Sequence, residues 1–297
     1  MIWVPVIALL AAAGLGVYLL WDCCLRRRAG KAAGDPELEE WLKGVSSESV
    51  SVTSDDDLAL RGTFFPKKDA RGTVLLLHGR RERWETVFSA PARFLYETGF
   101  QLLCAEQRGH GRSGGAFATY GVWERFDVRA WLHFLSWRCG EEHPIFLYGR
   151  AEGAAAALMA CALDNPGSLR GVVAEGGYDL PQSYVAARLR ARHFPFPEAL
   201  AAYLSACASL FLGFGLRDCR ALDAMRESAC PVLLLRGGKD PCVPASDARL
   251  LREACAAGGL ILTVEGAGHG TCWETDGAKV RSAVEAFLER NLPKQEP

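Results

Sequence analysis

The sequence predicts an α/β protein in which a mainly parallel sheet of eight strands has helices on both faces. Short apolar runs recur along the chain, and helical patterns separate most of them, an alternation typical of parallel sheets. The run at residues 73–77 is apolar throughout, as expected of a strand that is covered on both sides. Strands are expected at residues 49–52, 58–65, 73–77, 101–105, 144–148, 171–174, 231–235 and 260–264.

The first two strands differ from the others. Residues 49–52 alternate apolar and polar side chains, and three aspartates at residues 55–57 form a turn before the strand at 58–65. This hairpin predicts an antiparallel edge to the sheet. Helices are expected at residues 36–43, 85–98, 123–137, 152–163, 246–257 and 276–292.

Composition limits the class of protein. The 297 residues are 49% hydrophobic, enough for one large domain with a sizeable core plus an appendage. Thirty-four Lys and Arg against 35 Asp and Glu give a net charge of −1, so no basic field indicates nucleic-acid binding. The 11 cysteines include no C-x-x-C pair, which leaves no recognisable zinc site and fits a reduced compartment. We expect neither a metal nor an organic cofactor.

The first segment predicts a membrane anchor. Residues 2–21 contain no charged side chain, and 20 helical residues span about 30 Å, the thickness of a bilayer core. Trp3, Tyr18 and Trp21 suit the two membrane interfaces. Basic residues follow the apolar run rather than precede it, which favours an uncleaved anchor over a signal peptide and predicts a single-pass protein with a cytoplasmic domain. These residues are Arg26, Arg27, Arg28 and Lys31.

The chain therefore divides into three parts. We expect a transmembrane anchor at residues 1–22, a juxtamembrane linker at 23–46 and a folded domain at 47–297. Within the domain, residues 179–225 break the alternation of strands and helices and are rich in aromatic side chains. An insertion at this place would cover the strand ends where ligands bind, so we interpret it as a small helical lid. Its apolar character fits an acyl or lipid-like ligand and, equally, packing against the body.

One strand-to-helix junction resembles a catalytic motif. The segment GRAEG at residues 149–153 follows the strand at 144–148 and opens an alanine-rich helix. It matches a G-x-S-x-G nucleophile elbow in its two glycines, Gly149 and Gly153, but Ala151 stands at the serine position.

Three other strand ends carry polar motifs. HGRR follows the strand at 73–77, and the backbone N–H beyond such a turn commonly supplies half of an oxyanion hole. RGGKDPCVP places Asp240 after the strand at 231–235, and GAGHG places His269 after the last strand. The chain order of elbow, aspartate and histidine is the order seen in α/β-hydrolases.

On these motifs, residues from about 52 to 292 resemble an α/β-hydrolase-fold protein. The resemblance is to the serine-hydrolase branch that includes monoglyceride-lipase-like and serine-aminopeptidase-like members. CAEQRGHGRSGG, residues 104–115, resembles the D-x-R-G-x-G-x-S segment of that branch, with Glu106 at the usual aspartate. The resemblance implies a general base and an orienting acid, two oxyanion N–H donors and a nucleophile position. In that order these roles fall on His269, Asp240, Arg80, Glu152 and Ala151.

A methyl group at Ala151 cannot attack a carbonyl, so ester or amide hydrolysis through an acyl-serine is expected to be weak or absent. Several alternatives stay open. Glu152 or a thiol could be the nucleophile, a dyad of His269 and Asp240 could activate water directly, or Ala151 could be an engineered replacement of serine in an active esterase or lipase. A non-catalytic protein that binds a ligand or partner is a further possibility. The candidate thiols are Cys104, Cys161 and Cys242.

Other polar residues near the motifs have simpler interpretations. We interpret His78, His110 and Arg108 as structural residues of their turns. The basic cluster of Arg80, Arg81 and Arg83 could bind an anion, but a solvated cluster of charges is the favoured interpretation.

Overall fold

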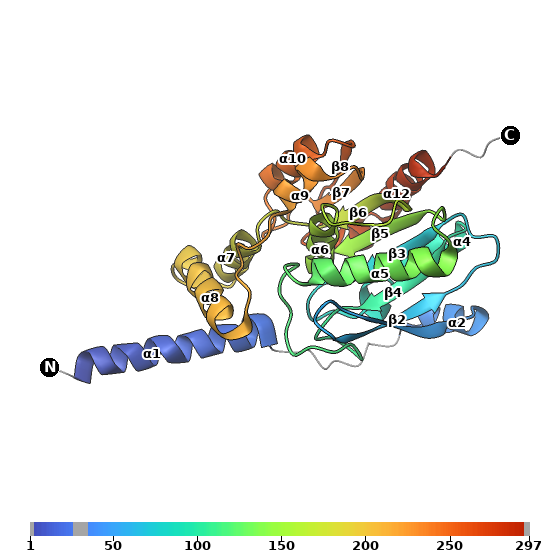
Figure 1. The fold of residues 1–297 in the computed structure, drawn as a ribbon. Helices are drawn as coiled ribbons and strands as arrows, with labels where there is room; N and C mark the ends of the chain where they lie inside the picture. The colour runs from blue at the N-terminus through green and yellow to red at the C-terminus, as the bar shows by residue number, and fades with distance from the viewer. Residues whose placement is uncertain (1–2, 26–34, 294–297) are drawn as a thin grey trace.

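The computed structural model describes residues 3–25 and 35–293 and contains one eight-stranded sheet of order β1-β2-β4-β3-β5-β6-β7-β8 (Figure 1). β1 pairs antiparallel with β2, and β2 pairs antiparallel with β4, whereas all other neighbours are parallel. The predicted antiparallel edge and all eight strands are confirmed. The strands are β1 Glu48–Thr53, β2 Ala59–Phe65, β3 Thr73–Leu77, β4 Gln101–Glu106, β5 Ile145–Arg150, β6 Leu169–Glu175, β7 Val232–Gly237 and β8 Gly259–Val264.

Helices cover both faces of the sheet because the parallel strands are apolar on both sides. Along β3, Leu75 and Leu77 face one core cluster, and Val74 and Leu76 face the other. The first cluster lies under α5, α6, α9 and α10, and the second under α3, α4, α11 and α12. These helices are α3 Trp84–Val87, α4 Ser89–Glu97, α5 Glu124–Cys139, α6 Glu152–Ala160, α9 Ala221–Glu227, α10 Ala245–Ala254, α11 Cys272–Thr275 and α12 Gly277–Asn291.

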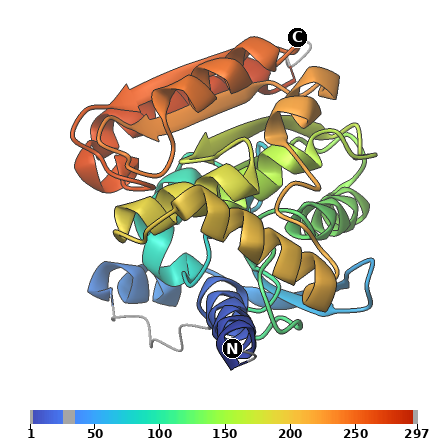
Figure 2. The ribbon, with the colours of Figure 1, turned by 90° about the vertical axis from the view of Figure 1, so that its left-hand side faces the viewer.

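Two predicted elements differ from the structure. The helix expected at residues 85–98 is two helices, because the backbone leaves helical geometry at Phe88, which is the C-cap of α3 and the N-cap of α4. The predicted insertion contains α7 (Pro181–Ala191), α8 (Pro197–Leu212) and α9. However, α9 packs against α6 and α10 in the body, so α7 and α8 alone form the raised pair. Figure 2 shows these two helices crossing in front of the sheet.

The N-terminal segment forms α1 (Trp3–Leu20) and a π-helical turn, η1 (Trp21–Leu25). α1 projects from the sheet domain and packs beside α8, where the Tyr203 hydroxyl donates to the carbonyl of Ala12 at 2.7 Å (Figure 1). Within residues 3–25 and 35–293, no helix reaches the length and apolarity needed to cross a membrane. The transmembrane span at residues 2–21 therefore stays a prediction. The basic residues predicted to flank it, from Arg26 to Lys31, lie outside the described residues.

A short helix precedes the sheet. α2 (Pro36–Gly44) lies where a helix was expected, and the carboxylate of Asp35 caps it by accepting from the N–H groups of Glu37 and Leu38. α2 packs on α4, at the side of the sheet away from α1 (Figure 1).

Candidate active site at the carboxyl ends of the strands

Four loops that follow β3, β5, β7 and β8 meet at one edge of the sheet. The chain continues from β3 to β4 on one side and later returns to β5 on the other, so these loops lie where open α/β sheets bind ligands. They bring together Arg80, Ala151, Asp240 and His269. Arg80, Ala151, Glu152 and His269 line one pocket of about 410 Å³, and Asp240 lies behind the histidine with its side chain 1% exposed.

The elbow at Ala151 has the backbone of a nucleophile turn. Ala151 has φ +50° and ψ −114°, a conformation that costs an alanine about 1–3 kcal/mol. The flanking glycines permit the tight approach: a Cβ on Gly153 would lie 2.0 Å from the carbonyl oxygen of Leu77, and a Cβ on Gly149 would lie 2.4 Å from that of Gly153. The N–H of Ala151 donates to the carbonyl of Glu175 at 2.8 Å. The predicted turn is therefore present, with a methyl group at its tip.

His269 and Asp240 form a hydrogen-bonded pair. The Nδ1 of His269 lies 2.8 Å from Oδ2 of Asp240. Burial alone would raise the pKa of Asp240, but hydrogen bonding to His269 and to the backbone N–H groups of Cys242 and Val243 outweighs it and lowers that pKa. An ionised Asp240 fixes the proton of a neutral imidazole on Nδ1 and leaves Nε2 as an acceptor. This is the arrangement that a general base needs.

Tyr184, on the lid helix α7, contacts the Nε2 acceptor of His269. The hydroxyl of Tyr184, on α7, lies 3.1 Å from Nε2 of His269 and 3.3 Å from Oε1 of Glu152, and it accepts from Arg188 at 3.0 Å. A phenol has one proton, so Tyr184 donates either to the histidine or to the carboxylate. Its ring stacks on Tyr178 with centroids 4.0 Å apart. Tyr184 thus links the His269–Asp240 pair to Glu152.

The carboxylate of Glu152 occupies the place predicted for an oxyanion. Its Oε2 accepts from the backbone N–H of Arg80 at 3.1 Å, and its Oε1 lies 3.2 Å from Nη1 of Arg188 and 3.7 Å from Nε of Arg80. Burial alone would raise the pKa of Glu152, but Arg188 and Arg80 outweigh it and lower the pKa. The group is therefore an anion at neutral pH.

This geometry differs from the role predicted for Arg80. The N–H of Arg80 was expected to bind a substrate oxyanion, and it instead donates to Glu152. The neighbouring N–H groups are also engaged: that of Gly79 donates to Glu82 at 2.9 Å, and that of Arg81 donates to Nε2 of His110 at 2.9 Å. A negative oxygen developing here would meet a carboxylate rather than a free donor.

The alternative nucleophiles are poorly placed. Both oxygens of Glu152 are engaged as described above. Cys104 is fully buried, and burial raises its pKa well above the ordinary value. Cys161 is also buried, and its thiol donates to the carbonyl of Ala157. Cys242 lines the pocket, but burial and the nearby Asp240 raise its pKa, which keeps it a thiol at neutral pH.

The residues interpreted as structural lie in structural contacts. Burial lowers the pKa of His78 to about 3, and its Nε2 accepts from the N–H of Gln107. Arg108 donates to both oxygens of Asp127 at 2.6 Å and reaches Asp56 at 3.0 Å. These contacts fix the turns that follow β3 and β4.

The basic cluster is not solvated as a whole. Arg83 pairs with Glu85 at the surface, with its side chain 48% exposed. The side chains of Arg80 and Arg81 are 3% and 15% exposed and line the pocket. The favoured interpretation of a solvated cluster therefore holds for Arg83 and is wrong for the other two.

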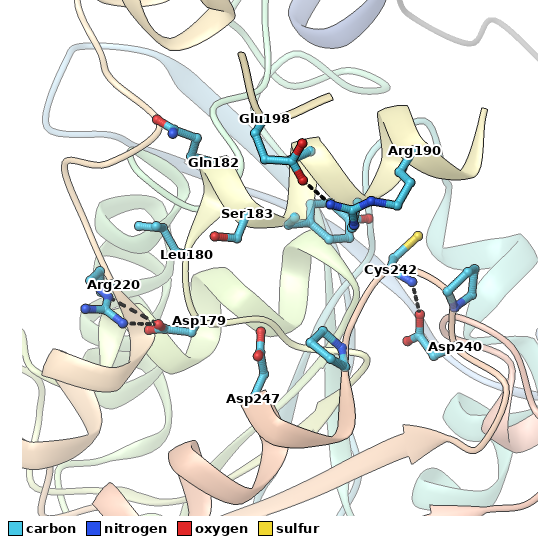
Figure 3. Close-up of a pocket in the computed structure, with 15 residues that line it drawn as sticks. Asp179, Leu180, Gln182, Ser183, Arg190, Glu198, Arg220, Asp240, Cys242 and Asp247 are labelled. Carbon is cyan, nitrogen blue, oxygen red and sulfur yellow. Dashed lines mark hydrogen bonds and ion pairs between the residues drawn. The ribbon is translucent and has the colours of Figure 1, made fainter. Parts of the chain in front are cut away.

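A second pocket of about 460 Å³ adjoins the first and shares Tyr184 and Cys242 with it. It lies between α7 and the loop that follows β7, and Figure 3 shows the side chains around it. Asp179 on its wall is paired with Arg220, whereas burial, and then Asp179 itself, raise the pKa of Asp247. This second space gives a ligand room beside the His269–Asp240 pair.

Two pocket residues carry no motif and were not predicted. Tyr184 and Arg188 lie four residues apart on one face of α7, and Arg192 is the residue that caps the end of this helix. The four-residue spacing of these polar residues is the signal that the sequence offers. It predicts a polar face on the helix but does not predict which residues that face contacts. Among the described residues, no group of three or more histidine, cysteine or acidic side chains could hold a metal ion.

Comparison with known proteins agrees with the fold. A family model described as "Serine aminopeptidase, S33" matches residues 68–210, and one described as "TAP-like protein" matches residues 199–296. The Pyrococcus furiosus esterase Pf2001 has a TM-score of 0.72 at 22% identity, covering 90% of this chain and 97% of that one. Est1E of Butyrivibrio proteoclasticus has a TM-score of 0.62 at 18% identity, covering 82% of this chain and 98% of that one. The chain therefore has the fold of these α/β-hydrolase structures.

Its relatives in sequence are uncharacterized proteins. YqkD of Bacillus subtilis (strain 168) is 22% identical over 230 residues, 77% of this chain and 75% of that protein. Rv2307c of Mycobacterium tuberculosis is 25% identical over 288 residues, 96% of this chain and 94% of that protein. The second alignment runs through the N-terminal segment as well as the domain that contains the sheet.

Proposed function

We propose that this protein descends from acyl hydrolases and uses its pocket to bind a ligand without acyl transfer. The observation that carries the proposal is the hydrogen bond from the N–H of Arg80 to Glu152. Loss of the nucleophile alone leaves an oxyanion hole that can still bind a carbonyl oxygen, whereas here an anion fills the hole. Removal of one oxyanion donor lowers kcat by about 10²–10³-fold. Occupation of the hole by Glu152 should therefore lower the rate beyond the effect of alanine at the nucleophile position.

The test compares the full-length protein with a His269→Ala variant on short acyl esters and a fluorophosphonate probe. We expect both to hydrolyse the esters at the same background rate and neither to be labelled. Hydrolysis by the unmodified chain that depends on His269 would contradict the proposal. Thermal unfolding of both proteins confirms that each is folded during the assay.

A second candidate function follows from the His269–Asp240 pair, which is intact. A general base of this kind could activate a water molecule or take a proton from a bound ligand. Nε2 lies 3.1 Å from the hydroxyl of Tyr184 in the structure, so a water molecule or ligand that uses this base must displace that contact. The same assay separates the two functions, because water activation gives His269-dependent turnover without labelling by the probe.

We also propose that α1 anchors the chain in a membrane, with the hydrolase domain on the cytoplasmic side, and that α8 contacts the same membrane. Most of the large apolar side chains that are exposed in the described residues lie on these two adjacent helices. Val17 on α1 is 67% exposed, and Leu210 and Phe211 on α8 are 77% and 67% exposed. A contiguous apolar surface of this kind is typical of a membrane contact.

Membrane fractionation tests the anchor. We expect the full chain to stay with membranes after an alkaline wash, and its recovery in the supernatant would refute anchoring. For α8, replacing Leu210 and Phe211 by serine should weaken binding to vesicles. The matched control is Leu250→Ser on α10, which is 50% exposed and lies in the body of the domain.

A further inference from the structure

The mouth of the pocket contains a cluster of guanidinium groups around one carboxylate. Asp22, in η1, directly follows the apolar helix α1, and its side chain is 7% exposed. Nη2 of Arg81 lies 3.3 Å from its Oδ1, and Nη1 of Arg192 lies 2.7 Å from its Oδ2. Nη1 of Arg80 donates to the backbone carbonyl of Asp22 at 3.2 Å, and Arg81 donates to the same oxygen. Three arginines from two separate elements therefore converge on one residue.

The backbone next to Asp22 also contacts the domain. The hydroxyl of Tyr120 donates to the carbonyl of Cys23 at 2.8 Å, and Cys23 is 6% exposed. Cys23 packs near Arg80, Arg188 and Arg192, beside the pocket. The residues after α1 thus contact the arginines that line one side of the pocket.

In the part of the chain that the structure describes, arginines outnumber carboxylates in and beside this pocket. Among the described residues, two carboxylates, Glu82 and Glu152, line the pocket, and Asp22 contacts Arg81 and Arg192 beside it. The arginines that line the pocket are Arg80, Arg81, Arg188 and Arg192. Nε of Arg80 is buried and makes no hydrogen bond. Burying guanidinium groups is costly unless anions pair with them, so the site favours a ligand that carries more negative charge than one carboxylate.

We propose that Arg80, Arg81 and Arg192 form a binding site for the phosphate group of a phosphate ester, and that Asp22 occupies this site when no ligand is bound. A phosphate monoester carries close to two negative charges and three acceptor oxygens, which three guanidinium groups can share. The ligand displaces Asp22 and extends past Ala151 into the pocket. This inference rests on the proposal that the pocket binds a ligand without cleaving an ester.

The position of the site suggests two sources of the phosphate. Asp22 lies at the end of α1, so a lipid headgroup at a membrane surface could reach the arginines, and a soluble phosphate ester could reach them from water. Both sources present the same group to the same arginines. The experiment therefore uses one probe of each kind.

Binding to the full-length protein in detergent tests the site with glycerol phosphate, and flotation with vesicles tests it with phosphatidic acid against phosphatidylcholine alone. Asp22→Asn removes the internal competitor, and we expect binding of the phosphate probe to tighten by about fivefold or more. Arg81→Gln and Arg192→Gln remove donors, and each should weaken binding roughly tenfold. Arg192 is 42% exposed at its side chain, so its replacement is not expected to disturb the fold.

Arg83→Gln is the matched control, since it removes the same charge from the same loop while Arg83 pairs with Glu85. Phosphate binding that is unchanged by Asp22→Asn and equally affected by Arg81→Gln and Arg83→Gln would overturn the proposal. Binding of phosphatidic acid but not glycerol phosphate, dependent on Arg81, would support it and assign the lipid source. These experiments measure phosphate binding, whereas the esterase assay measures hydrolysis. A negative result for phosphate binding therefore leaves the proposed absence of ester hydrolysis intact, and a positive result for hydrolysis leaves the measured phosphate binding intact.

Discussion

The two halves of the candidate site differ in how far they match a working hydrolase. On one side, Asp240 and His269 lie 2.8 Å apart, with the pKa of the carboxyl lowered as a general base requires. On the other side, Ala151 stands at the tip of the elbow, and Glu152 accepts the N–H that should bind an oxyanion. The pair of Asp240 and His269 is therefore assembled, whereas the N–H of Arg80 on the other side is already hydrogen-bonded to Glu152.

The second half differs from a serine-hydrolase site by more than one hydroxyl group, because Glu152 departs from the pattern as well as Ala151. The charges of Arg80 and Arg188 pair with Glu152, so this half is a buried ion cluster that contributes to the fold of the site. The strained backbone of Ala151 persists because Gly153 packs tightly on the end of β3 and Gly149 packs tightly on the first turn of α6. Substitutions on either side of the site test the two halves separately.

Gly153→Ala should have the largest effect on stability. The new Cβ would lie 2.0 Å from the carbonyl oxygen of Leu77, which is backbone and cannot move aside cheaply. We expect the free energy of unfolding to fall by about 3 kcal/mol. Gly167→Ala is the control, since nothing lies within 4 Å of its added Cβ. Equal denaturant midpoints for the two variants would show that the elbow is not packed as described.

Glu152→Gln should destabilise the protein in a manner that depends on pH. The pKa of Glu152 is lowered in the folded state, so its charge contributes stability above the unfolded pKa of about 4.3, and this is lost as pH falls through the folded pKa. We expect a cost of about 2 kcal/mol at pH 7 that shrinks below about pH 4. Glu198→Gln, in an exposed pair with Arg190, should show little effect at either pH. A cost for Glu152→Gln that is constant from pH 3 to pH 7 would refute the ion cluster.

Tyr184 contacts both halves of the site, and a double-mutant cycle measures its interaction with His269. Tyr184→Phe combined with His269→Ala should show a coupling free energy of about 1 kcal/mol, because the two side chains lie 3.1 Å apart. Tyr178→Phe combined with His269→Ala is the control, since the hydroxyl of Tyr178 donates instead to the carbonyl of Tyr120. Equal coupling in both cycles would mean that the Tyr184–His269 contact contributes nothing.

Ala151→Gly should have the smallest effect and the opposite sign. Glycine adopts a positive φ without strain, which offsets its greater freedom in the unfolded chain, and we expect a gain of about 0.5 kcal/mol. Ala154→Gly, inside α6, should instead destabilise, because it lies in a regular helix. A loss of stability for both variants, read from thermal unfolding, would indicate that Ala151 is unstrained.

Much of the fold follows from local patterns in the sequence, and part of the site does not. Apolar runs and turn residues placed all eight strands, and the motifs placed Ala151, Asp240 and His269 at strand ends. The position of the Glu152 side chain depends on Arg188, which a lid helix supplies from far along the chain. The contacts of Asp22 depend on how α1 leaves the domain. Such long-range contacts leave no periodic signal, just as the break at Phe88 left none.

Restoring a serine at position 151, with and without the carboxylate of Glu152, tests whether this carboxylate blocks the oxyanion position. We compare Ala151→Ser alone, Ala151→Ser with Glu152→Ala, and Ala151→Ser with Glu198→Ala as the matched control. The rate of labelling by a fluorophosphonate probe is measured for each. We predict that the variant with Glu152→Ala is labelled at least about 10²-fold faster than the other two. Equal and rapid labelling of all three would contradict the claim that Glu152 blocks the oxyanion hole.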